Sequence, residues 1–483
     1  MAPQLRGCLL TPNTERTVFP RLVLAGLSGG AGKTIVSLGL ARAWADAGLR
    51  VKPFKKGPDY IDATWLGLAA RNPCTNLDPG LMERDPLAAL FLEKAQGADI
   101  SLVEGNRGLF DGKDVTGSCS TAELARTLRA PVALVIDCTK MTRTVAAIVQ
   151  GCASFEPDIA LAGVILNRTA GERHRSLLRR AIEEYTDVTV LGALPKLKQN
   201  PIPERHMGLW SDRELDGDSD AALGELGRTM ADCLDLERLR DEAGSAPVLP
   251  RPDVDIWPRP EPGPKPAIGY VHDAALWFYY PENLEALERA GARLVRLSLL
   301  DDAPWPELHG LYLGGGFPET LAERLAANQA RREAVRGLVF AGLPVYAECG
   351  GFMYLCERLE YEGRSWPMAG VFPLETGFCE RPQGLGYTEA EVREQTPFFE
   401  VGDIVRGHEF HYSRCVRPGG AESLRFALRM LRGNGMLDGR DGLRSQRTHA
   451  GYNHIFALGT PQWAPNFVRA ARAYMLQTSG EDE

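Results

Sequence analysis

The sequence predicts an α/β protein of two domains, each built on a mostly parallel β-sheet with helices on both faces. Its 483 residues exceed what a single hydrophobic core normally organises. A proline-rich segment, residues 242–266 ("EAGSAPVLPRPDVDIWPRPEPGPKP"), divides the chain into two parts of domain size. In both parts, short apolar runs alternate with amphipathic stretches, a pattern typical of parallel strands that are buried on both faces.

The apolar runs define the expected strands. Before the proline-rich segment they are "RLVLAG", "VKPFKK", "ISLVEG", "PVALVIDC", "LAGVILNR" and "VTVLGALP". After it they are "AIGYVH", "RLVRLS", "GLYLGGG" and "LPVYAECGG". The density of proline between them predicts an extended, semi-rigid linker. The expected domains therefore span residues 18–241 and 267–475, joined by the linker 242–266.

Composition narrows the class of protein. Hydrophobic residues make up 44% and charged residues 24% of the chain, as in ordinary globular proteins. The net charge of −8 argues against a nucleic-acid partner, which usually needs a basic surface. Ten cysteines without a CxxC pair suit reduced thiols in a cytoplasmic protein. With no apolar run of 18 residues and no apolar leader, we expect neither a membrane span nor a signal peptide.

A glycine-rich loop, "GLSGGAGKT", follows the first expected strand. Five residues separate Gly26 from Gly32, where a standard Walker A loop has four. A strand precedes the loop and a helical run follows it, so its N–H groups are expected to face an anion. Lys33 would reach the outer phosphates of a nucleotide, and the Thr34 hydroxyl would face Mg²⁺. The predicted nucleotide-binding residues are Gly29, Gly30, Ala31, Gly32, Lys33 and Thr34.

Carboxylates follow two other expected strands of the first half. Asp59 and Asp62 lie in "KKGPDYID", and Glu104 and Asp111 lie in "LVEGNRGLFDG". The carboxyl ends of parallel strands meet at one edge of a sheet, so these acids are expected near the phosphate loop. Glu104 and Asp59 are predicted to join Thr34 in holding Mg²⁺. For Asp62 and Asp111, an ordinary solvated loop residue is an equally good interpretation.

In the second half, "LPVYAECGGFMYL" places Cys349 between an expected strand and an expected helix. Small residues flank it, as in the sharp turn of a nucleophile elbow. The following helix N-terminus is expected to lower the pKa of the Cys349 thiol. Glycines of "GLYLGGGFPE", Gly315 and Gly316, together with Gly350, are predicted to supply oxyanion-hole N–H groups. The other nine cysteines are interpreted as inert buried thiols.

A thiol nucleophile near neutral pH needs a base. His454, in "GYNHIFALG", is the preferred base because its neighbours are apolar and a helical run follows. His408, His411 and His449 compete for this role, and the residues alone leave the choice open.

Taken together, these stretches resemble the cobyrinate a,c-diamide synthase family of ATP-dependent, glutamine-hydrolysing enzymes in corrin biosynthesis. The resemblance extends from about Leu22 to Ala471. The matching stretches are "GLSGGAGKT", "KKGPDYID", "VEGNRGLFDG", "GVILNR", "PERHMGL", "FYYPENLEAL", "LYLGGGFPE", "AECGGFMYL" and "GHEFHYS". The longer phosphate loop is similar to that of dethiobiotin synthetase-like P-loop proteins. The resemblance thus implies a dethiobiotin synthetase-like ATP domain followed by a flavodoxin-like glutamine amidotransferase domain.

The resemblance also implies roles for residues. Cys349 would attack the glutamine amide, and His454, which matches the first histidine of the family's Tyr-x-His-x-His pattern, would activate it. The first half would use MgATP to phosphorylate the a- and c-acetate side chains of cobyrinate, and ammonia would displace phosphate. Asn167 in "GVILNR" would lie near the adenine. The implied substrate residues are Asp59, Tyr60, Asp62 and Asp111. A homodimer is compatible with the sequence.

One departure and several rivals accompany this resemblance. Phe456 stands where many related amidotransferases have glutamate and this family often has histidine, so His454 lacks an evident carboxylate partner. Hydrogenobyrinate and nickel sirohydrochlorin are alternative substrates, and a cobyric acid synthase fits the motifs less well. The phosphate loop alone would suit a ParA-like nucleotide switch, which has no need of Cys349. A glutaminase remnant used as a scaffold would tolerate replacement of Cys349.

Overall fold

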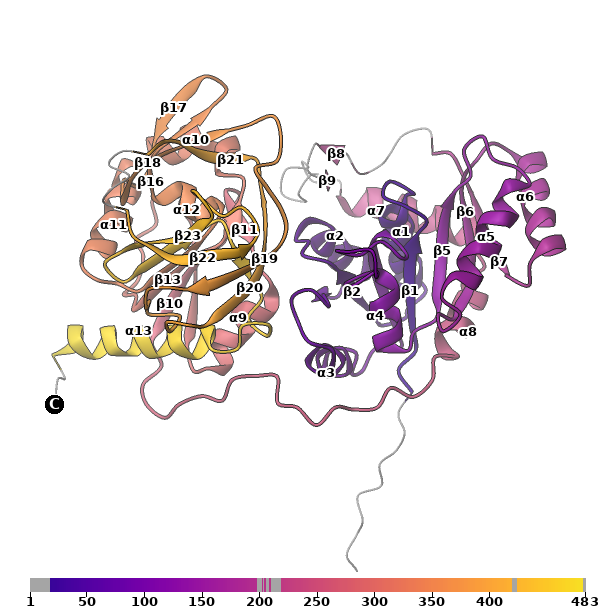
Figure 1. The fold of residues 1–483 in the computed structure, drawn as a ribbon, viewed down its shortest axis with the longest axis horizontal. Helices are drawn as coiled ribbons and strands as arrows, with labels where there is room; N and C mark the ends of the chain where they lie inside the picture. Colours follow the sequence, from indigo (N-terminus) through magenta and orange to yellow (C-terminus); the bar gives the residue numbers. More distant parts are fainter. Residues whose placement is uncertain are drawn as a thin grey trace, which may run out of the picture.

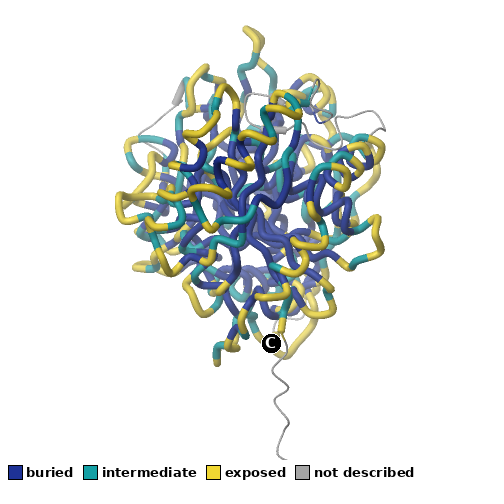
Figure 2. Tube along the Cα trace, turned by 90° about the vertical axis from the view of Figure 1, so that its right-hand side faces the viewer, coloured by how far each residue is buried: buried dark blue, intermediate teal, exposed yellow. Residues whose placement is uncertain are grey.

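The computed structural model describes residues 18–197, 202, 204–205, 208–209, 219–418 and 424–480. Two α/β domains lie side by side, and an extended segment that begins after residue 244 runs beneath both of them (Figure 1). Buried residues concentrate in the middle of the molecule, and exposed residues follow the outer loops (Figure 2). The predicted fold class is confirmed.

The first domain contains a seven-stranded parallel sheet in the order β3-β2-β4-β1-β5-β6-β7. The six strands that were predicted from their apolar runs, β1, β2, β4, β5, β6 and β7, all belong to this sheet, and the short edge strand β3 was not predicted. The strand bounds are β1 Arg21–Gly26, β2 Val51–Lys56, β3 Thr75–Leu77, β4 Ile100–Gly108, β5 Val132–Asp137, β6 Leu161–Thr169 and β7 Val190–Pro195. Two short strands, β8 Glu204–Arg205 and β9 Gly208–Leu209, pair separately.

Helices cover this sheet, and α1 packs along α7. Their bounds are α1 Lys33–Asp46, α2 Ile61–Ala70, α3 Arg84–Lys94, α4 Thr121–Leu128, α5 Thr144–Phe155, α6 Glu172–Tyr185, α7 Ser219–Cys233 and α8 Leu236–Gly244. The helix α8 includes three residues that the sequence assigned to the linker, because Glu242 forms an i,i+4 ion pair with Arg238 at 2.9 Å. The parallel arrangement brings the carboxyl ends of β1, β2 and β4 to one edge.

The second domain contains a ten-stranded sheet in the order β12-β10-β13-β15-β24-β23-β22-β19-β20-β25. The strands β12, β10, β13, β15 and β24 pair in parallel, and the rest of the sheet is antiparallel. The sheet is therefore mixed, and its antiparallel half was not predicted. Strands such as β19 alternate buried with partly exposed residues, so they lack the continuous apolar runs that marked the parallel strands.

The strands of the second domain have the following bounds: β10 Ala267–Val271, β11 Leu276–Phe278, β12 Arg293–Leu297, β13 Gly310–Leu313, β14 Gly315–Gly316, β15 Val345–Glu348, β16 Cys356–Tyr361, β17 Arg364–Pro367, β18 Phe372–Phe378, β19 Gly384–Val392, β20 Ile404–His411, β21 Ser413–Pro418, β22 Phe426–Arg432, β23 Arg440–Ser445, β24 Thr448–Gly451 and β25 His454–Ile455. Its helices are α9 Pro281–Arg289, the 3₁₀ helix η1 Pro318–Leu321, α10 Ala322–Ala327, α11 Gln329–Phe340, α12 Gly350–Leu355 and α13 Trp463–Ser479. None of the described helices combines the length and apolar character that crossing a bilayer requires.

The linker also contacts both domains. Trp257 donates a hydrogen bond from Nε1 to Glu93 of α3 at 2.8 Å. Its ring lies under the guanidinium of Arg289 on α9, at 4.3 Å, and under Lys94 at 5.1 Å. Arg289 also pairs with Glu93 at 2.8 Å. Figure 1 shows α3 and α9 facing each other across the interface, so Trp257 bridges the two domains at that point.

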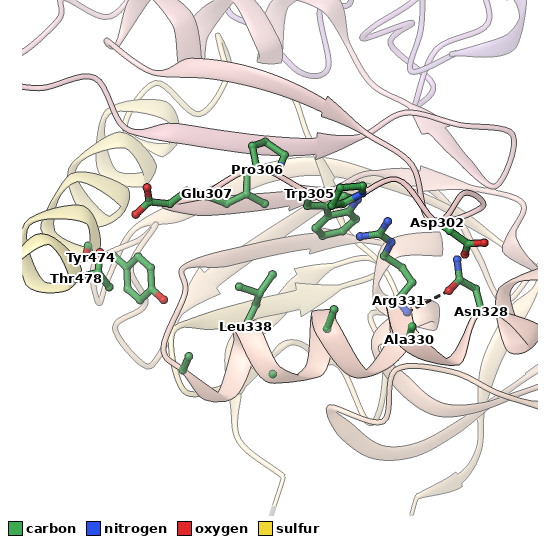
Figure 3. Close-up of a pocket in the computed structure, with 15 residues that line it drawn as sticks. Asp302, Trp305, Pro306, Glu307, Asn328, Ala330, Arg331, Leu338, Tyr474 and Thr478 are labelled. Carbon is green, nitrogen blue, oxygen red and sulfur yellow. Dashed lines mark hydrogen bonds between the residues drawn. The ribbon is translucent and has the colours of Figure 1, made fainter.

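A cavity of about 800 Å³ lies in the second domain between α11, α13 and the loop after β12 (Figure 3). Arg331 stacks over Trp305 at 4.4 Å on one wall, and Tyr474 comes from α13. None of the residues predicted to act in catalysis or nucleotide binding lines this cavity.

Candidate functional site

The phosphate loop joins β1 to α1. Gly32 has φ 89°, a left-handed conformation that favours glycine, and α1 begins at the next residue. A Cβ on Gly32 would lie 2.2 Å from the Asn167 side chain, so a larger residue would also collide there. A Cβ on Gly29 or Gly30 would meet nothing within 4 Å. The loop is therefore open on the side where a phosphate would approach the helix N-terminus.

Two side chains fix this loop from inside the domain. Lys33 is buried, and burial is the first cause of its lowered pKa. Its Cγ and Cδ lie 3.0 Å from the position of a Cβ on Gly26, so Lys33 folds back over the loop. Asn167, at the end of β6, donates from Nδ2 to the Ala31 carbonyl at 2.9 Å. The structure thus brings Asn167 to the phosphate loop, and its expected contact with adenine stays a prediction.

Acidic side chains meet Thr34 at the carboxyl edge of the sheet. The Thr34 hydroxyl donates to Glu104 Oε1 at 2.8 Å and lies 3.4 Å from Asp62 Oδ2. Lys55 Nζ, from the end of β2, lies 2.8 Å from Asp62 and 3.0 Å from Glu104. Sequence reasoning missed Lys55, although it is the first lysine of "KKGPDYID". Asp62 lies in the same cluster as Thr34 and Glu104.

The oxygen atoms of this cluster suit Mg²⁺. Glu104 is fully buried, and its Oε2 has no hydrogen-bond partner among the described residues. A buried carboxylate oxygen without a partner is costly unless a ligand uses it. Mg²⁺ is typically held by one or two carboxylates together with phosphate oxygens. Glu104, Asp62 and the Thr34 hydroxyl therefore fit the ion, which would offset charge on a bound phosphate.

Asp59 and Asp111 lie beside this cluster. Asp59 Oδ1 accepts from the Asp62 N–H at 2.8 Å, and Asp111 Oδ2 accepts from the Gly108 N–H at 2.9 Å. Burial and then the neighbouring Asp62 carboxylate raise the pKa of Asp59 to about 7. The role of Asp59 as a Mg²⁺ ligand stays a prediction, since its described contact is to the backbone of α2.

Cys349 forms a sharp turn between β15 and α12. Its backbone has φ 46° and ψ −101°, an uncommon left-handed value for a residue with a side chain. A Cβ on Gly351 would lie 2.3 Å from the Leu313 carbonyl oxygen, so the turn tolerates no larger residue there. Burial raises the pKa of the Cys349 thiol well above its ordinary value. The expected lowering by a helix N-terminus is therefore wrong, because α12 is only six residues long and the thiol is buried.

His454 has a carboxylate partner that the sequence did not indicate. Its Nδ1 lies 3.3 Å from Oε2 of Glu348, the residue directly before Cys349. Glu348 is 1% exposed and also accepts hydrogen bonds from the Tyr312 hydroxyl and the Ile455 N–H, both at 3.1 Å. The signal in the sequence was a lone glutamate in the apolar strand "VYAE". Phe456, at the position where many related amidotransferases have glutamate, is buried against Tyr280.

The three other candidate histidines each stack on a different ring. His408 stacks on His454, with ring centroids 4.9 Å apart. His411 stacks on Tyr452 at 3.7 Å, and His449 stacks on Tyr346 at 5.3 Å.

The predicted oxyanion glycines lie next to His454. Its Cε1 is 2.5 Å from the position that a Cβ on Gly315 would take. A Cβ on Gly350 would lie 3.0 Å from the Gly316 backbone nitrogen. The three glycines thus lie together, at the turn that carries Cys349.

The two clusters face each other across the domain interface. Tyr60, from the first domain, stacks on Phe278 at 5.0 Å and lies 5.6 Å from the His454 ring. A small cavity of about 150 Å³ lies at this contact. Its lining joins both domains: Pro58, Asp59, Tyr60, Ile61, Asp62, Phe278, His408, Phe410 and His454. Phe278 and the stacked position of His408 carry no signal in the sequence, because they depend on how the domains meet.

Comparisons with known proteins agree with this two-part site. Residues 22–209 match the CobQ/CobB/MinD/ParA nucleotide binding domain. Residues 267–462 match the CobB/CobQ-like glutamine amidotransferase domain. The first match contains the phosphate loop and the Thr34–Glu104 cluster, and the second contains Cys349 and His454.

Curated relatives align along nearly the whole chain. A cobyrinate a,c-diamide synthase of Magnetococcus marinus is 42% identical over 93% of this chain and 97% of its own length. Those of Syntrophotalea carbinolica and Dehalococcoides mccartyi are 40% and 38% identical, each over 94% of this chain and 99% of their own length. With a nucleotide domain, a glutamine amidotransferase domain and this degree of identity, the chain belongs to the cobyrinate a,c-diamide synthase family of glutamine-hydrolysing ligases.

Proposed function

We propose that this protein amidates the a- and c-acetate carboxylates of cobyrinate, with glutamine as nitrogen donor and ATP as the activating co-substrate. The proposed domains are residues 18–241 for ATP-dependent amidation and 267–475 for glutamine hydrolysis. One observation carries the proposal beyond family membership. The cavity of about 150 Å³ is lined by Asp59 and Asp62 on one side and by His454 on the other, which supports a route for ammonia between the two sites.

Glutamine hydrolysis is proposed to start with Cys349. His454 takes the thiol proton as Sγ attacks the side-chain carbonyl of glutamine, and it gives the proton to the departing ammonia. Because burial holds the Cys349 thiol protonated, a base at this position is needed. N–H groups of Gly315, Gly316 and Gly350 are proposed to stabilise the oxyanion. Water then hydrolyses the thioester to glutamate. Glu348 is proposed to orient the His454 ring through Nδ1.

Amidation is proposed to occur at the carboxyl edge of the first sheet. A carboxylate of the substrate attacks the γ-phosphate of ATP, ADP leaves, and an acyl phosphate forms. Ammonia attacks the acyl carbon, phosphate leaves, and an amide remains after loss of a proton. Lys33 and the loop N–H groups are proposed to bind the phosphates. Lys55, which lies between Asp62 and Glu104, supports a charged site there. Mg²⁺, when bound at Thr34, Asp62 and Glu104, would neutralise phosphate charge.

The wall of the small cavity suits the transfer of ammonia. Burial and then the neighbouring His454 lower the pKa of His408 well below its ordinary value, so His408 is uncharged near pH 7. An uncharged imidazole has no ready proton to give to ammonia, which therefore stays in its nucleophilic form. Tyr60 and Phe278 add aromatic walls that keep water out of the passage.

The test measures the mass of the amidated product with cobyrinate, using glutamine or ammonium chloride, in the wild type and Cys349→Ala. We expect two added amides in the wild type from either nitrogen source, and amidation by Cys349→Ala from ammonium only. Amidation of hydrogenobyrinate or nickel sirohydrochlorin in place of cobyrinate would correct the substrate. ATP hydrolysis without amidation of any tetrapyrrole would overturn the proposed function.

A further inference from the structure

A second cavity at the domain interface, of about 400 Å³, continues from the small one. It shares Pro58, Asp59, His408 and Phe410 with that cavity and lies beside Asp111. Its volume is within the range of small-molecule sites, about 300–1,000 Å³. Both domains line it, so a molecule bound there would touch the first sheet and the second at once.

Four cations line this cavity: Lys56, Arg107, Lys113 and Arg432. Lys56 ends β2, Arg107 lies near the end of β4, Lys113 follows in the next loop, and Arg432 ends β22 of the second domain. None of the four side chains forms an ion pair or a hydrogen bond with another described residue. Unpaired cations from three strand ends and a loop, gathered around one cavity, indicate an anionic ligand.

Lys56 is the buried cation among the four that line this cavity. It is only 4% exposed, and burial is the first cause of its lowered pKa. Its ammonium forms no direct ion pair with a described residue, and the nearby Asp78 carboxylate offsets only part of the cost of burial. An anionic ligand would supply the remaining opposite charge. Arg107 adds a second cost, because its φ of 54° is a strained left-handed value for arginine. Both costs are explained if the two side chains are held ready for the same ligand.

The acids of the same cavity do not compete for these cations. Asp59 and Asp111 accept from the Asp62 and Gly108 N–H groups. Glu409 accepts from the N–H groups of Asn434 and Gly435, at 2.6 and 3.0 Å. Asp59 and Asp111 are thus held by backbone donors of their own turns and Glu409 by those of the turn after β22, whereas the four cations have no such partner.

The second-domain wall also carries apolar and aromatic side chains. Leu385 is 58% exposed although it is a large aliphatic residue, and Phe410 lies on the next strand, β20. Tyr387 is fixed by donating to Asp78 of the first domain at 2.8 Å. An apolar wall rimmed by cations fits a flat molecule with apolar faces and charged edges.

We propose that this interdomain cavity binds one edge of the tetrapyrrole, and that Lys56, Arg107, Lys113 and Arg432 receive its outer carboxylates, those that are not amidated. This inference rests on the proposed function and adds the location of its substrate. Arg432 is then a binding residue that the glutaminase domain supplies to the reaction of the ATP domain. The edge of the substrate that faces Asp59 and Asp111 carries the reacting acetate.

The test compares Arg432→Ala and Lys56→Met with Arg429→Ala, a control on the same strand whose side chain pairs with Glu391 at 3.0 Å, outside the cavity. KM for cobyrinate is measured with ammonium chloride as nitrogen source, so that glutamine hydrolysis does not contribute. Losing one charge-assisted contact should raise this KM about ten-fold or more in the first two variants. Glutamine hydrolysis and KM for ATP should stay near wild type in the control Arg429→Ala. Thermal unfolding should also be unchanged in Arg432→Ala, because its side chain is exposed.

A second arm changes the ligand. In cobyrinate whose propionate carboxylates are methyl esters, wild-type KM should rise, and Arg432→Ala should add little further change. The inference is overturned if Arg432→Ala and Lys56→Met both keep KM within two-fold of wild type, or if Arg432→Ala has the same effect on both substrates. A wild type that amidates no tetrapyrrole would instead overturn the proposed function, so the two failures are distinguishable.

Discussion

The pair Glu348 and His454 joins residues that are 106 positions apart and shows what a single side chain contributes to the site. Glu348 ends β15 directly before Cys349, and it accepts from His454, Tyr312 and Ile455. If it orients the imidazole, Glu348→Gln should lower the rate of glutamine hydrolysis by on the order of 100-fold. Amidation with ammonium should remain. Glu357→Gln, at an exposed position on β16, is the control.

The rates of amidation with glutamine and with ammonium, measured side by side, distinguish a role in orienting His454 from a role in folding. If Glu348→Gln lowers both rates equally, its role is structural. The sequence did not indicate Glu348 as the partner of His454, because many related amidotransferases have the partner carboxylate two residues after the histidine, where this chain has Phe456. The parallel pairing of β15 with β24, which ends just before His454, brings the two residues together, and this pairing is a tertiary feature. Lys33, Thr34 and Cys349 could be proposed from the sequence, because their neighbours along the chain specify the turn on which each lies.

At the scale of secondary-structure elements, apolar runs predicted β1, β5 and β6 closely, whereas β19, β20 and β22 were missed. Buried parallel strands need apolar residues at every position, so their signal is local. A strand with one partly exposed face has a weaker signal, and its partner is chosen by the rest of the fold.

The first turn of α9 buries the carboxylate of Glu282, and this burial should make stability depend on pH. Glu282 is 1% exposed, Oε2 has no partner among the described residues, and burial raises its pKa to about 7. An acid with a raised pKa in the folded state favours folding when protonated. The contribution of protonated Glu282 to the free energy of unfolding is therefore lost as pH rises from about 4.5 to about 7.

Glu282→Gln should remove this dependence and stabilise the protein at pH 8, by at most about 3 kcal/mol. Thermal unfolding between pH 5 and pH 8 measures the effect, with Glu288→Gln on the exposed side of α9 as control. A wild-type melting temperature that rises steadily over this range, with no difference in Glu282→Gln, would contradict the assignment.

At the scale of the whole molecule, the proposed transfer of ammonia requires the domain interface to stay closed around the small cavity. Trp257 of the linker bridges α3 and α9 through Glu93 and Arg289. Trp257→Ala should loosen this contact without touching either site. We therefore expect both half-reactions to persist, glutamine hydrolysis and ammonium-dependent amidation, while glutamine-dependent amidation falls because ammonia escapes.

The measurement is the ratio of glutamate released to amide formed, which should stay near one in the wild type and rise in Trp257→Ala. Trp305→Ala is a matched control: Trp305 also lies under an arginine, Arg331 at 4.4 Å, but in the separate cavity between α11 and α13 (Figure 3). An unchanged ratio in Trp257→Ala would show that the linker does not hold the passage closed. A rise in both variants would point to general destabilisation. A rise in Trp257→Ala alone ties the transfer of ammonia to the closed interface, because nothing else that the two sites share has been altered.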